Sequence, residues 1–313
     1  MNIQQLEYII AVDNYRHFAK AAEASFITQP TLSMMIQKLE DELDVKIFDR
    51  TSHPTEPTAC GKKIIEQART ILKQIAQIKE IVQEEKDIIR GTFTLGIIPT
   101  VAPYIIPDLL RIHEETNSSI QLIIKEMNTA EIIKNIHTGN IDGGLLATPL
   151  NQPKITEYPI YYEKFYAYIS PSENIYAKQK IKSDDLKQIK NIWLLEDVHC
   201  FRNQTLKLCQ FSKKQIEKST ATYQAGSIDT LINIVDNNQG VTVIPELAAM
   251  KLSEDQQDHL RDFEDMIAVR EISLAVHFDF IRQRMMTEII HLIKKIIPSS
   301  MQDTQLKTYT LDL

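Results

Sequence analysis

The stretch HFAKAAEASFITQPTLSMMIQKLEDELDVKIFDRT, residues 17–51, decides the fold of the N-terminal part of this chain. Residues 17–24 are rich in strong helix formers, and they follow a segment, 2–13, with apolar residues at helical spacing. Ser25, Phe26 and Ile27 have the character of a turn. Short helices joined by a tight turn are typical of a helix-turn-helix, so the stretch predicts that motif.

The third helix of this region has a clear start and two distinct faces. Thr28 is suited to an N-cap, and Pro30 is tolerated in a first helical turn. Residues spaced by three and four positions form an apolar stripe that we expect to face a core: Leu32, Ile36, Leu39 and Leu43. The remaining face is polar, with Gln29, Thr31, Ser33, Gln37 and Lys38.

After this helix we expect a small wing and then a long helix. Residues 45–51 suggest a strand, and Pro54 and Pro57 interrupt the next segment, as in the hairpin of a winged helix-turn-helix. Beyond Thr58, apolar residues at alternating spacings of four and three form a possible seam: Ile64, Ala68, Ile71, Ile75, Ile78 and Val82. A helix packed on its own protein would show such a stripe for two turns, whereas six seam positions favour a dimer contact.

From Arg90 onward strands and helices alternate, which predicts α/β units with mostly parallel sheets. The expected strands are 92–98, 120–126, 141–146, 165–169, 191–195, 241–244 and 272–277. The expected helices include 128–137, stretches after Ser227 and Pro245, and 282–297. Because about 220 residues exceed what one compact sheet needs, we expect two subdomains.

The chain as a whole has the composition of an ordinary folded protein. It has 313 residues, of which 43% are hydrophobic and 25% charged. Its N-terminus lacks a secretory signal, and no run of about eighteen apolar residues exists, so we expect a cytosolic protein without a membrane segment. The net charge is −7, and residues 1–60 carry five Lys or Arg against nine Asp or Glu. Charge alone therefore argues mildly against a nucleic-acid partner.

Several motifs together resemble the DNA-binding signature of LysR-type transcription regulators. The marks are Ala21-Ala22, Gln29-Pro30-Thr31-Leu32-Ser33, Leu39-Glu40, Phe48-Asp49-Arg50-Thr51 and Thr58-Ala59-Cys60-Gly61. The resemblance implies a winged helix-turn-helix at 1–58, a dimerising linker helix at 59–89 and an α/β regulatory domain at 90–300, with a tail at 301–313. The regulatory domain would have two lobes like a periplasmic binding protein, lobe I at about 90–163 and 267–300 and lobe II at about 164–266.

The same resemblance assigns the polar helix face to operator DNA. The N-terminal end of a recognition helix lies over base edges in the major groove. Gln29 and Gln37 can offer amides to adenine, and Thr31 or Ser33 can reach bases or phosphate. Lys38, Arg50 and Lys46 are suited to the phosphate backbone. His53-Pro54 departs from the basic pair that is common in the family's wing.

Within the LysR family, the peroxide-sensing members are the most similar. The similarity lies in LLEDVHCFRNQTLKLC, residues 194–209, and in GIIPTVAPY, residues 96–104. It implies that Cys200 and Cys209 are redox-active. It also implies a peroxide pocket made of Thr100, Thr129, His199, Arg202, Asn203 and Arg270. Asn203 stands where such proteins often have an aspartate, and Cys60 lies outside the sensor pattern and receives no role.

The residues around the two cysteines suit this chemistry. His199 and Arg202 flank Cys200, and positive neighbours stabilise the thiolate that attacks peroxide. We expect a sulfenic acid at Cys200 and then a disulfide with Cys209. If 200–209 is helical, nine steps separate the two Cα atoms by roughly 13.5 Å, whereas a disulfide needs them within about 7 Å. Bond formation would then require local refolding, which can repack subunits.

Two other functions remain open from the residues. A LysR-type regulator could bind a small organic effector between its lobes, and Thr100 and Thr129 could hydrogen-bond a carboxylate. A thiol peroxidase could use the same cysteines, although the helix-turn-helix would then have no purpose. The sequence has no Cys-x-x-Cys, His-Glu-x-x-His, Walker loop or Gly-x-Ser-x-Gly elbow, and so indicates neither a metal nor a cofactor.

The family resemblance also implies partners. We expect operator DNA, RNA polymerase, a second copy of the chain in a dimer of dimers, hydrogen peroxide as the signal, control of antioxidant genes, and glutaredoxin or thioredoxin as reductant.

Overall fold

The computed structural model describes residues 1–52, 54–85, 89–116, 118–187, 189–196, 200–209, 224–265 and 267–311. The chain divides into two compact units, Met1–Ile88 and Ile89–Leu313, and each is described by itself. Within the described ranges, no helix is both long enough and apolar enough to cross a membrane.

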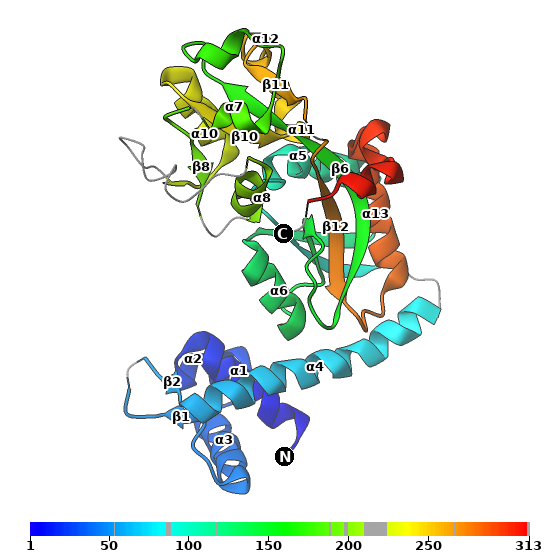
Figure 1. Cartoon of the computed structure of the whole chain (residues 1–313). Helices are drawn as coiled ribbons and strands as arrows, with labels where there is room; N and C mark the ends of the chain where they lie inside the picture. The colour runs from blue at the N-terminus through cyan, green and yellow to red at the C-terminus, as the bar shows by residue number, and fades with distance from the viewer. Residues whose placement is uncertain are drawn as a thin grey trace. The chain divides into compact units, whose positions relative to one another are not determined.

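The first unit is a winged helix-turn-helix followed by a long helix (Figure 1). Its elements are α1 Ile3–Tyr15, α2 Phe18–Ala24, α3 Gln29–Leu43, β1 Phe48–Asp49, β2 Glu56–Pro57 and α4 Ala59–Glu85. Thr28 caps α3 by accepting a hydrogen bond from the Thr31 amide, as predicted. The predicted strand at 45–51 is confirmed only at β1, which pairs antiparallel with β2 to form the wing.

An apolar core joins the helices of this unit. It contains Leu6, Ile9, Val12, Ala21, Ala22, Leu32, Ile36, Leu39, Ile47, Phe48, Ile65 and Ala68. The predicted stripe of α3 is confirmed for its first three members, but Leu43 is 38% exposed. Leu43 is the last residue of the helix, and Asp44 turns left-handed directly after it, so the chain leaves the core there.

The structure corrects part of the seam that the sequence predicts on α4. Ala68 is 1% exposed and packs in the core of its own unit, together with the half-buried Ile64 and Ile71. Ala68 therefore cannot contact a second chain in this arrangement. Ile78 and Val82, by contrast, are 63% and 49% exposed. Among the six predicted seam residues, all of which the structure describes, Ile78 and Val82 are the exposed ones, and Ile75 is half-buried.

The second unit is a mixed α/β fold. Its first elements are β3 Gly91–Ile97, α5 Ala102–Glu115, β4 Ile120–Glu126, α6 Thr129–Thr138, β5 Gly143–Thr148 and β6 Ile155–Ile169. Next come η1 Asn174–Ala177, β7 Lys180–Ile181, α7 Ser183–Leu186, β8 Leu194–Leu195, α8 Cys200–Leu208, β9 Gln224–Ala225 and α10 Ile228–Asn237. The last are β10 Val241–Pro245, α11 Glu246–Ala249, α12 Glu254–Gln257, β11 Leu260–Phe263, β12 Val269–His277, α13 Gln283–Ile296, η2 Ser299–Gln302 and η3 Thr304–Tyr309.

The main sheet of the described residues corrects the expectation of mostly parallel strands. Its order is β4-β3-β5-β12-β6-β11-β7, with β10 also paired to β6. β3 is parallel to β4 and to β5, but β12 is antiparallel to β5 and to β6. β10 and β11 are likewise antiparallel to β6. The sequence signals at 165–169 and 272–277 marked only parts of two long antiparallel strands.

β6 and β12 run side by side and connect the two lobes of this unit (Figure 1). We use lobe I for β3, β4, β5, α5, α6 and α13 with the adjoining parts of β6 and β12. Lobe II comprises β7 to β11 with α7, α8, α10, α11 and α12. The start of β12 meets the middle of β6 at Arg270 and Glu163, where the sheet passes from one lobe to the other.

The C-terminal segment does not end at α13. η2 buries Met301, and η3 is followed by Thr310, which forms a parallel bridge with Val269. The Leu311 amide donates to the Val269 carbonyl at 2.9 Å. The segment expected as a polar tail therefore packs against the start of β12.

Candidate functional site

Cys200 is the first residue of α8, and its side chain is half-buried. Thr129, the first residue of α6, donates a hydrogen bond from Oγ1 to Cys200 Sγ at 3.6 Å. A capping box fixes this threonine, since Asn128 and Glu131 bond each other's backbone amides at 2.9 and 3.0 Å. The start of a helix favours negative charge, and an O–H donor stabilises a thiolate. The starts of α6 and α8 therefore bring a fixed hydroxyl donor, Thr129, to the sulfur of Cys200.

Cys209 lies in the opposite kind of environment. Its side chain is fully buried in the core of the second unit. Burial, with a contribution from the Asp265 carboxylate, raises the pKa of the Cys209 thiol to about 12. Cys209 is therefore a neutral thiol near pH 7. Both cysteines are free in this structure.

α8 keeps the two sulfurs apart, and the prediction that this segment is helical is confirmed. The helical pattern continues to Cys209, whose amide donates to the Thr205 carbonyl at 3.0 Å. Nine helical steps correspond to roughly 13.5 Å between the Cα atoms. A disulfide needs about 7 Å or less, so the described conformation cannot hold one.

A buried arginine lies beside this helix. Arg270 on β12 is fully buried, and its Nε donates to Glu163 Oε1 at 2.7 Å. Its other two nitrogens donate to Thr100, to Oγ1 at 2.9 Å and to the carbonyl oxygen at 3.2 Å. The guanidinium also lies 4.9 Å from the centroid of the Phe201 ring. Arg270 thus touches a carboxylate, a threonine and the residue that follows Cys200.

The structure brings together only some of the predicted pocket residues. Thr129 bonds to Cys200, and Thr100 bonds to Arg270. Arg202 is half-buried and donates to the Leu195 carbonyl at 2.8 Å, and Asn203 is exposed on α8. His199 lies outside the described residues, so its place in the pocket stays a prediction.

Sequence reasoning missed two residues of this region, Glu163 and Phe201. Phe201 is buried and stacks on Phe165 with ring centroids 5.4 Å apart, besides its contact with Arg270. Glu163 lies between Tyr162 and Lys164, in a run without any motif. Glu163 could be recognised as the partner of Arg270 from the pairing of β6 with β12, which the sequence does not show.

The recognition helix α3 presents most of the predicted DNA-binding side chains. Gln29, Pro30, Thr31, Gln37 and Lys38 are exposed, whereas Ser33 is half-buried and accepts a hydrogen bond from Arg50 at 3.0 Å. A groove of about 500 Å³ adjoins the start of this helix. Its lining adds cations that sequence reasoning did not place at the interface, Arg16 and Lys20, beside the predicted Gln29, Ser33 and Arg50.

The buried carboxylate of Glu40 fixes the wing against α3. Its Oε1 accepts from the amides of Ile47 and Phe48 at 2.7 and 3.3 Å. Its Oε2 pairs with Arg50 at 3.3 Å and with Lys46 at 3.6 Å. These bonds hold the base of the wing and the Arg50 side chain beside the polar face of α3.

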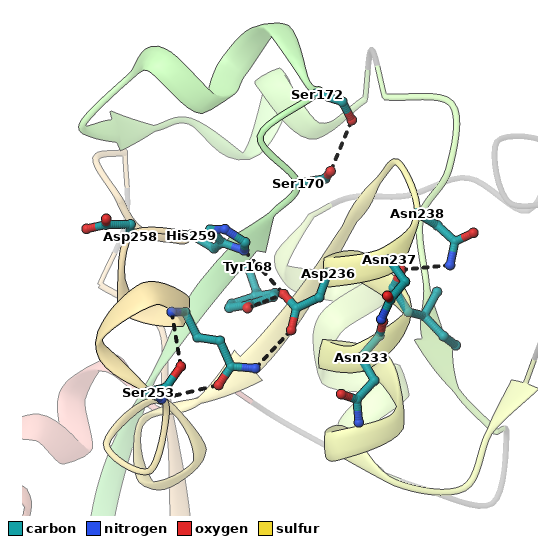
Figure 2. Close-up of polar contacts among 12 residues, drawn as sticks. Tyr168, Ser170, Ser172, Asn233, Asp236, Asn237, Asn238, Ser253, Asp258 and His259 are labelled. Atoms are coloured by element: carbon teal, nitrogen blue, oxygen red, sulfur yellow. Dashed lines mark hydrogen bonds and ion pairs between the residues drawn. The ribbon is translucent and has the colours of Figure 1, made fainter.

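A second polar cluster lies in lobe II around Asp236 (Figure 2). Tyr168 donates to one carboxylate oxygen, and Gln256 donates to the other at 2.8 Å. His259 Nδ1 lies 3.3 Å from the same carboxylate. Burial and Asp236 raise the pKa of the Tyr168 hydroxyl. The cluster joins β6, α10, α12 and the start of β11, which makes it an anchor of the lobe. In the part of the chain that the structure describes, no three His, Cys, Asp or Glu side chains could hold a metal ion.

Two family models match this chain. Residues 3–62 match the model of the bacterial regulatory helix-turn-helix proteins of the LysR family. Residues 86–296 match the model of the LysR substrate binding domain. Together they cover the winged helix-turn-helix, the start of α4 and nearly all of the α/β unit.

The similar proteins agree with these matches. A hydrogen peroxide-inducible genes activator of Haemophilus influenzae is 34% identical over 80% of this chain and 82% of its own length. The DNA-binding transcriptional dual regulator OxyR of Escherichia coli is 33% identical over 79% of this chain and 80% of its own length. Among solved structures, a full-length OxyR variant from Pseudomonas aeruginosa is similar, with a TM-score of 0.75 and 29% identity over 94% of this chain and 98% of that one. A hydrogen peroxide-bound OxyR variant from Corynebacterium glutamicum has a TM-score of 0.63 and 25% identity, and the match covers 100% of this chain and 97% of that one.

Proposed function

Because the chain belongs to the LysR family of bacterial regulatory helix-turn-helix proteins, we propose that it is a transcription regulator that senses hydrogen peroxide through Cys200. The observation that carries the proposal is the contrast between the two ends of α8. A half-buried thiol at the helix start accepts a hydrogen bond from Thr129, and a second thiol lies buried at the other end. The names of the similar proteins support the same signal.

The first chemical step is oxidation of Cys200. Its thiolate attacks one oxygen of hydrogen peroxide, the O–O bond breaks, and the departing hydroxide takes up a proton to give water, leaving a sulfenic acid on Cys200. Thr129 donates a hydrogen bond to the sulfur, and Thr100 can donate one to an oxygen of the peroxide. The Thr100 hydroxyl accepts from Arg270, and a hydroxyl that accepts still has its own proton to donate. A donor placed on the departing oxygen lowers the barrier.

The second step forms the disulfide. The sulfur of Cys209 attacks the sulfenic sulfur of Cys200, the S–O bond breaks, and the hydroxyl leaves with the Cys209 proton as a second water. α8 must unwind for the two sulfurs to meet, because the helical conformation holds them far apart. Cys209 must also leave the apolar core in which its thiol is buried. We propose that this refolding is the signal that reaches the DNA-binding unit.

The DNA interface is proposed from the exposed face of α3 and the groove beside it. Gln29, Thr31 and Gln37 would read base edges, whereas Lys38, Arg50, Arg16 and Lys20 would contact phosphates. The exposed Ile78 and Val82 on α4 support a dimer contact through that part of the helix. We also propose that the protein forms a dimer of dimers, acts with RNA polymerase and controls antioxidant genes. Its reductant would be glutaredoxin or thioredoxin. The proposed domains are the winged helix-turn-helix at 1–58, the linker helix at 59–89, the regulatory domain at 90–300 and the C-terminal segment at 301–313.

The test is peptide mapping of the reduced full-length protein before and after about one equivalent of peroxide, with free thiols alkylated. We expect a Cys200–Cys209 disulfide, which Cys200→Ser abolishes. Cys60→Ser is the matched control, because Cys60 is exposed in the other unit, and it should leave the disulfide intact. If both thiols of α8 stay free while the protein still binds operator DNA, the signal is another one, and an organic effector between the lobes becomes the function to test.

A further inference from the structure

Glu163 is a buried carboxylate that the proposed peroxide chemistry does not use. It is 0% exposed, and each of its oxygens has a partner. Oε1 accepts from Arg270 Nε at 2.7 Å, and Oε2 accepts from the Leu247 amide at 3.2 Å. Burial raises the pKa of the Glu163 carboxyl, and the Arg270 guanidinium opposes that rise. A buried carboxylate is costly unless it is paired, so Glu163 and Arg270 hold each other in place.

The Glu163–Arg270 pair contacts α8, the helix that begins at Cys200, through Phe201. Glu163 and Arg270 are cross-strand neighbours on β6 and β12, which fixes the guanidinium near the start of α8. That guanidinium lies over the Phe201 ring, which also stacks on Phe165. Buried cation–π contacts of this kind stabilise a ring in one position. Phe201 is the residue next to Cys200, so whatever holds Phe201 holds the first turn of α8.

We infer that Glu163 is a positioning residue of the redox switch, which fixes Arg270 against Phe201 and thereby stabilises the reduced, helical form of α8. The inference rests on the proposed disulfide between Cys200 and Cys209. Since α8 must unwind before that bond forms, Phe201 has to leave the guanidinium. The Glu163–Arg270 pair therefore opposes the disulfide and sets how oxidising the surroundings must be before it accumulates.

This role differs from direct action on peroxide. All three guanidinium nitrogens of Arg270 donate to Glu163 or Thr100, and Arg270 is wholly buried. A residue that polarises peroxide changes the rate of the first oxidation step. A residue that stabilises the helix changes the equilibrium between dithiol and disulfide instead. The two roles can be measured separately.

Glu163→Gln is the decisive variant. Glutamine keeps the shape of the side chain, but it has one acceptor oxygen for the two donors that Glu163 serves, and it has no charge to fix the guanidinium. The full-length protein is equilibrated in buffers of oxidised and reduced glutathione, and the ratio of disulfide to dithiol is measured by alkylation and mass spectrometry. We expect the disulfide to be favoured about tenfold more than in the unchanged protein. In a Cys209→Ser background, the rate of sulfenic acid formation on Cys200 should change by less than about twofold.

Glu271→Gln is the matched control. Glu271 is the next residue on β12, is also buried, and accepts hydrogen bonds from Thr148 and Ser273 rather than from Arg270. It should leave the glutathione equilibrium within about twofold of the unchanged protein. Phe201→Leu removes the ring while Glu163 and Arg270 stay paired, and it should favour the disulfide as Glu163→Gln does. If Glu163→Gln does not fold, Phe201→Leu still tests the inference, because an unchanged equilibrium in that variant would show that the Glu163–Arg270 pair does not act on α8 through the ring.

The other outcomes overturn the inference. If Glu163→Gln shifts the equilibrium no more than Glu271→Gln, Glu163 has only a general structural role. If it slows sulfenic acid formation without shifting the equilibrium, Arg270 acts on peroxide and not on the helix. If the unchanged protein forms no disulfide in any glutathione buffer, the proposed function fails, and the inference fails with it. A normal disulfide in the unchanged protein separates the failure of one from the failure of the other.

Discussion

The two ends of α8 carry the same functional group in opposite surroundings. At Cys200 the chain has just entered the helix, the sulfur is half-buried, and a threonine hydroxyl donates to it. At Cys209 the chain lies in the core, and burial raises the pKa of the thiol to about 12. One short helix thus begins at a sulfur that accepts a hydrogen bond and is followed by a sulfur that burial keeps neutral. The chemical difference between identical residues comes from their position, and that difference can be measured directly.

The largest expected effect is a difference in alkylation rate within the reduced protein. With a pKa of about 12, roughly one Cys209 thiol in ten thousand is ionised at pH 8. Iodoacetamide reacts with thiolates, so we expect Cys200 to react at least about a hundredfold faster than Cys209. Mass spectrometry of a time course gives both rates, and the exposed Cys60 is an internal reference. Equal rates for Cys200 and Cys209 in the folded protein would remove the contrast on which the proposed function rests.

Next in size is the hydrogen bond from Thr129. Thr129→Val keeps the shape of the side chain but removes the O–H that donates to Cys200 Sγ. A hydrogen bond to a charged group contributes about 1.5 kcal/mol, so oxidation of Cys200 by peroxide should slow about tenfold. The rate is measured by trapping the sulfenic acid in a Cys209→Ser background.

Thr138→Val is the control for that variant. Thr138 is the last residue of the same helix, α6, and its hydroxyl donates to the Lys134 carbonyl at 3.0 Å. The control should oxidise at the unchanged rate. If both valine variants slow oxidation equally, the effect comes from α6 as a whole and not from the bond to sulfur.

The sequence predicted the surroundings of Cys200 better than those of Cys209. Local signals gave the N-cap Thr28, the recognition helix and the helix that holds Thr129, because caps and apolar spacing act over a few residues. The family resemblance named Cys200 and Cys209. Neither the local signals nor the resemblance predicted that Cys209 is wholly buried, because its core neighbours come from several distant elements.

Long-range pairing explains the remaining misses. β6 is 15 residues long, but Pro159 interrupts the strand pattern of its first part, where the register with β12 also shifts, so 155–164 was not predicted as a strand. Glu163 and Arg270 are 107 positions apart in sequence, and nothing local marks them as partners. Ala68 looked like a seam residue because its spacing fits one, while only the packed structure shows that its own unit covers it.

The buried thiol also predicts a pH dependence of stability. The pKa of Cys209 lies near 9.0 in the unfolded chain and at about 12 in the folded one. Between these values the unfolded state releases a proton that the folded state keeps, so stability falls as pH rises from about 9 to about 12. The contribution of the neutral Cys209 thiol to stability is retained in full well below pH 9. The slope approaches about 1.4 kcal/mol per pH unit, which gives a loss of roughly 1 kcal/mol between pH 9 and pH 10.

Denaturant unfolding of the reduced protein at pH 8, 9 and 10 measures this dependence. Cys209→Ala is less stable at every pH because it leaves a small cavity, but its stability should fall less steeply over the same window. The difference in slope is the informative quantity, since other groups titrate equally in both proteins. Parallel curves for the two proteins would mean that the Cys209 thiol ionises as easily in the fold as outside it.

The smallest expected effect comes from Asp265, whose charge adds to burial in raising the pKa of Cys209. Its carboxylate accepts from the Ser183 amide and hydroxyl, and Asp265→Asn retains an acceptor oxygen for them. Removing the negative charge should lower the pKa of Cys209, and alkylation of that thiol at pH 9 should then rise about threefold. Glu264→Gln, at the neighbouring exposed position, is the control and should leave the rate unchanged. Because desolvation is the larger cause and Asp265 the smaller, a rise far above threefold would show that the variant opens the core around Cys209, and no rise would show that burial alone keeps the thiol neutral.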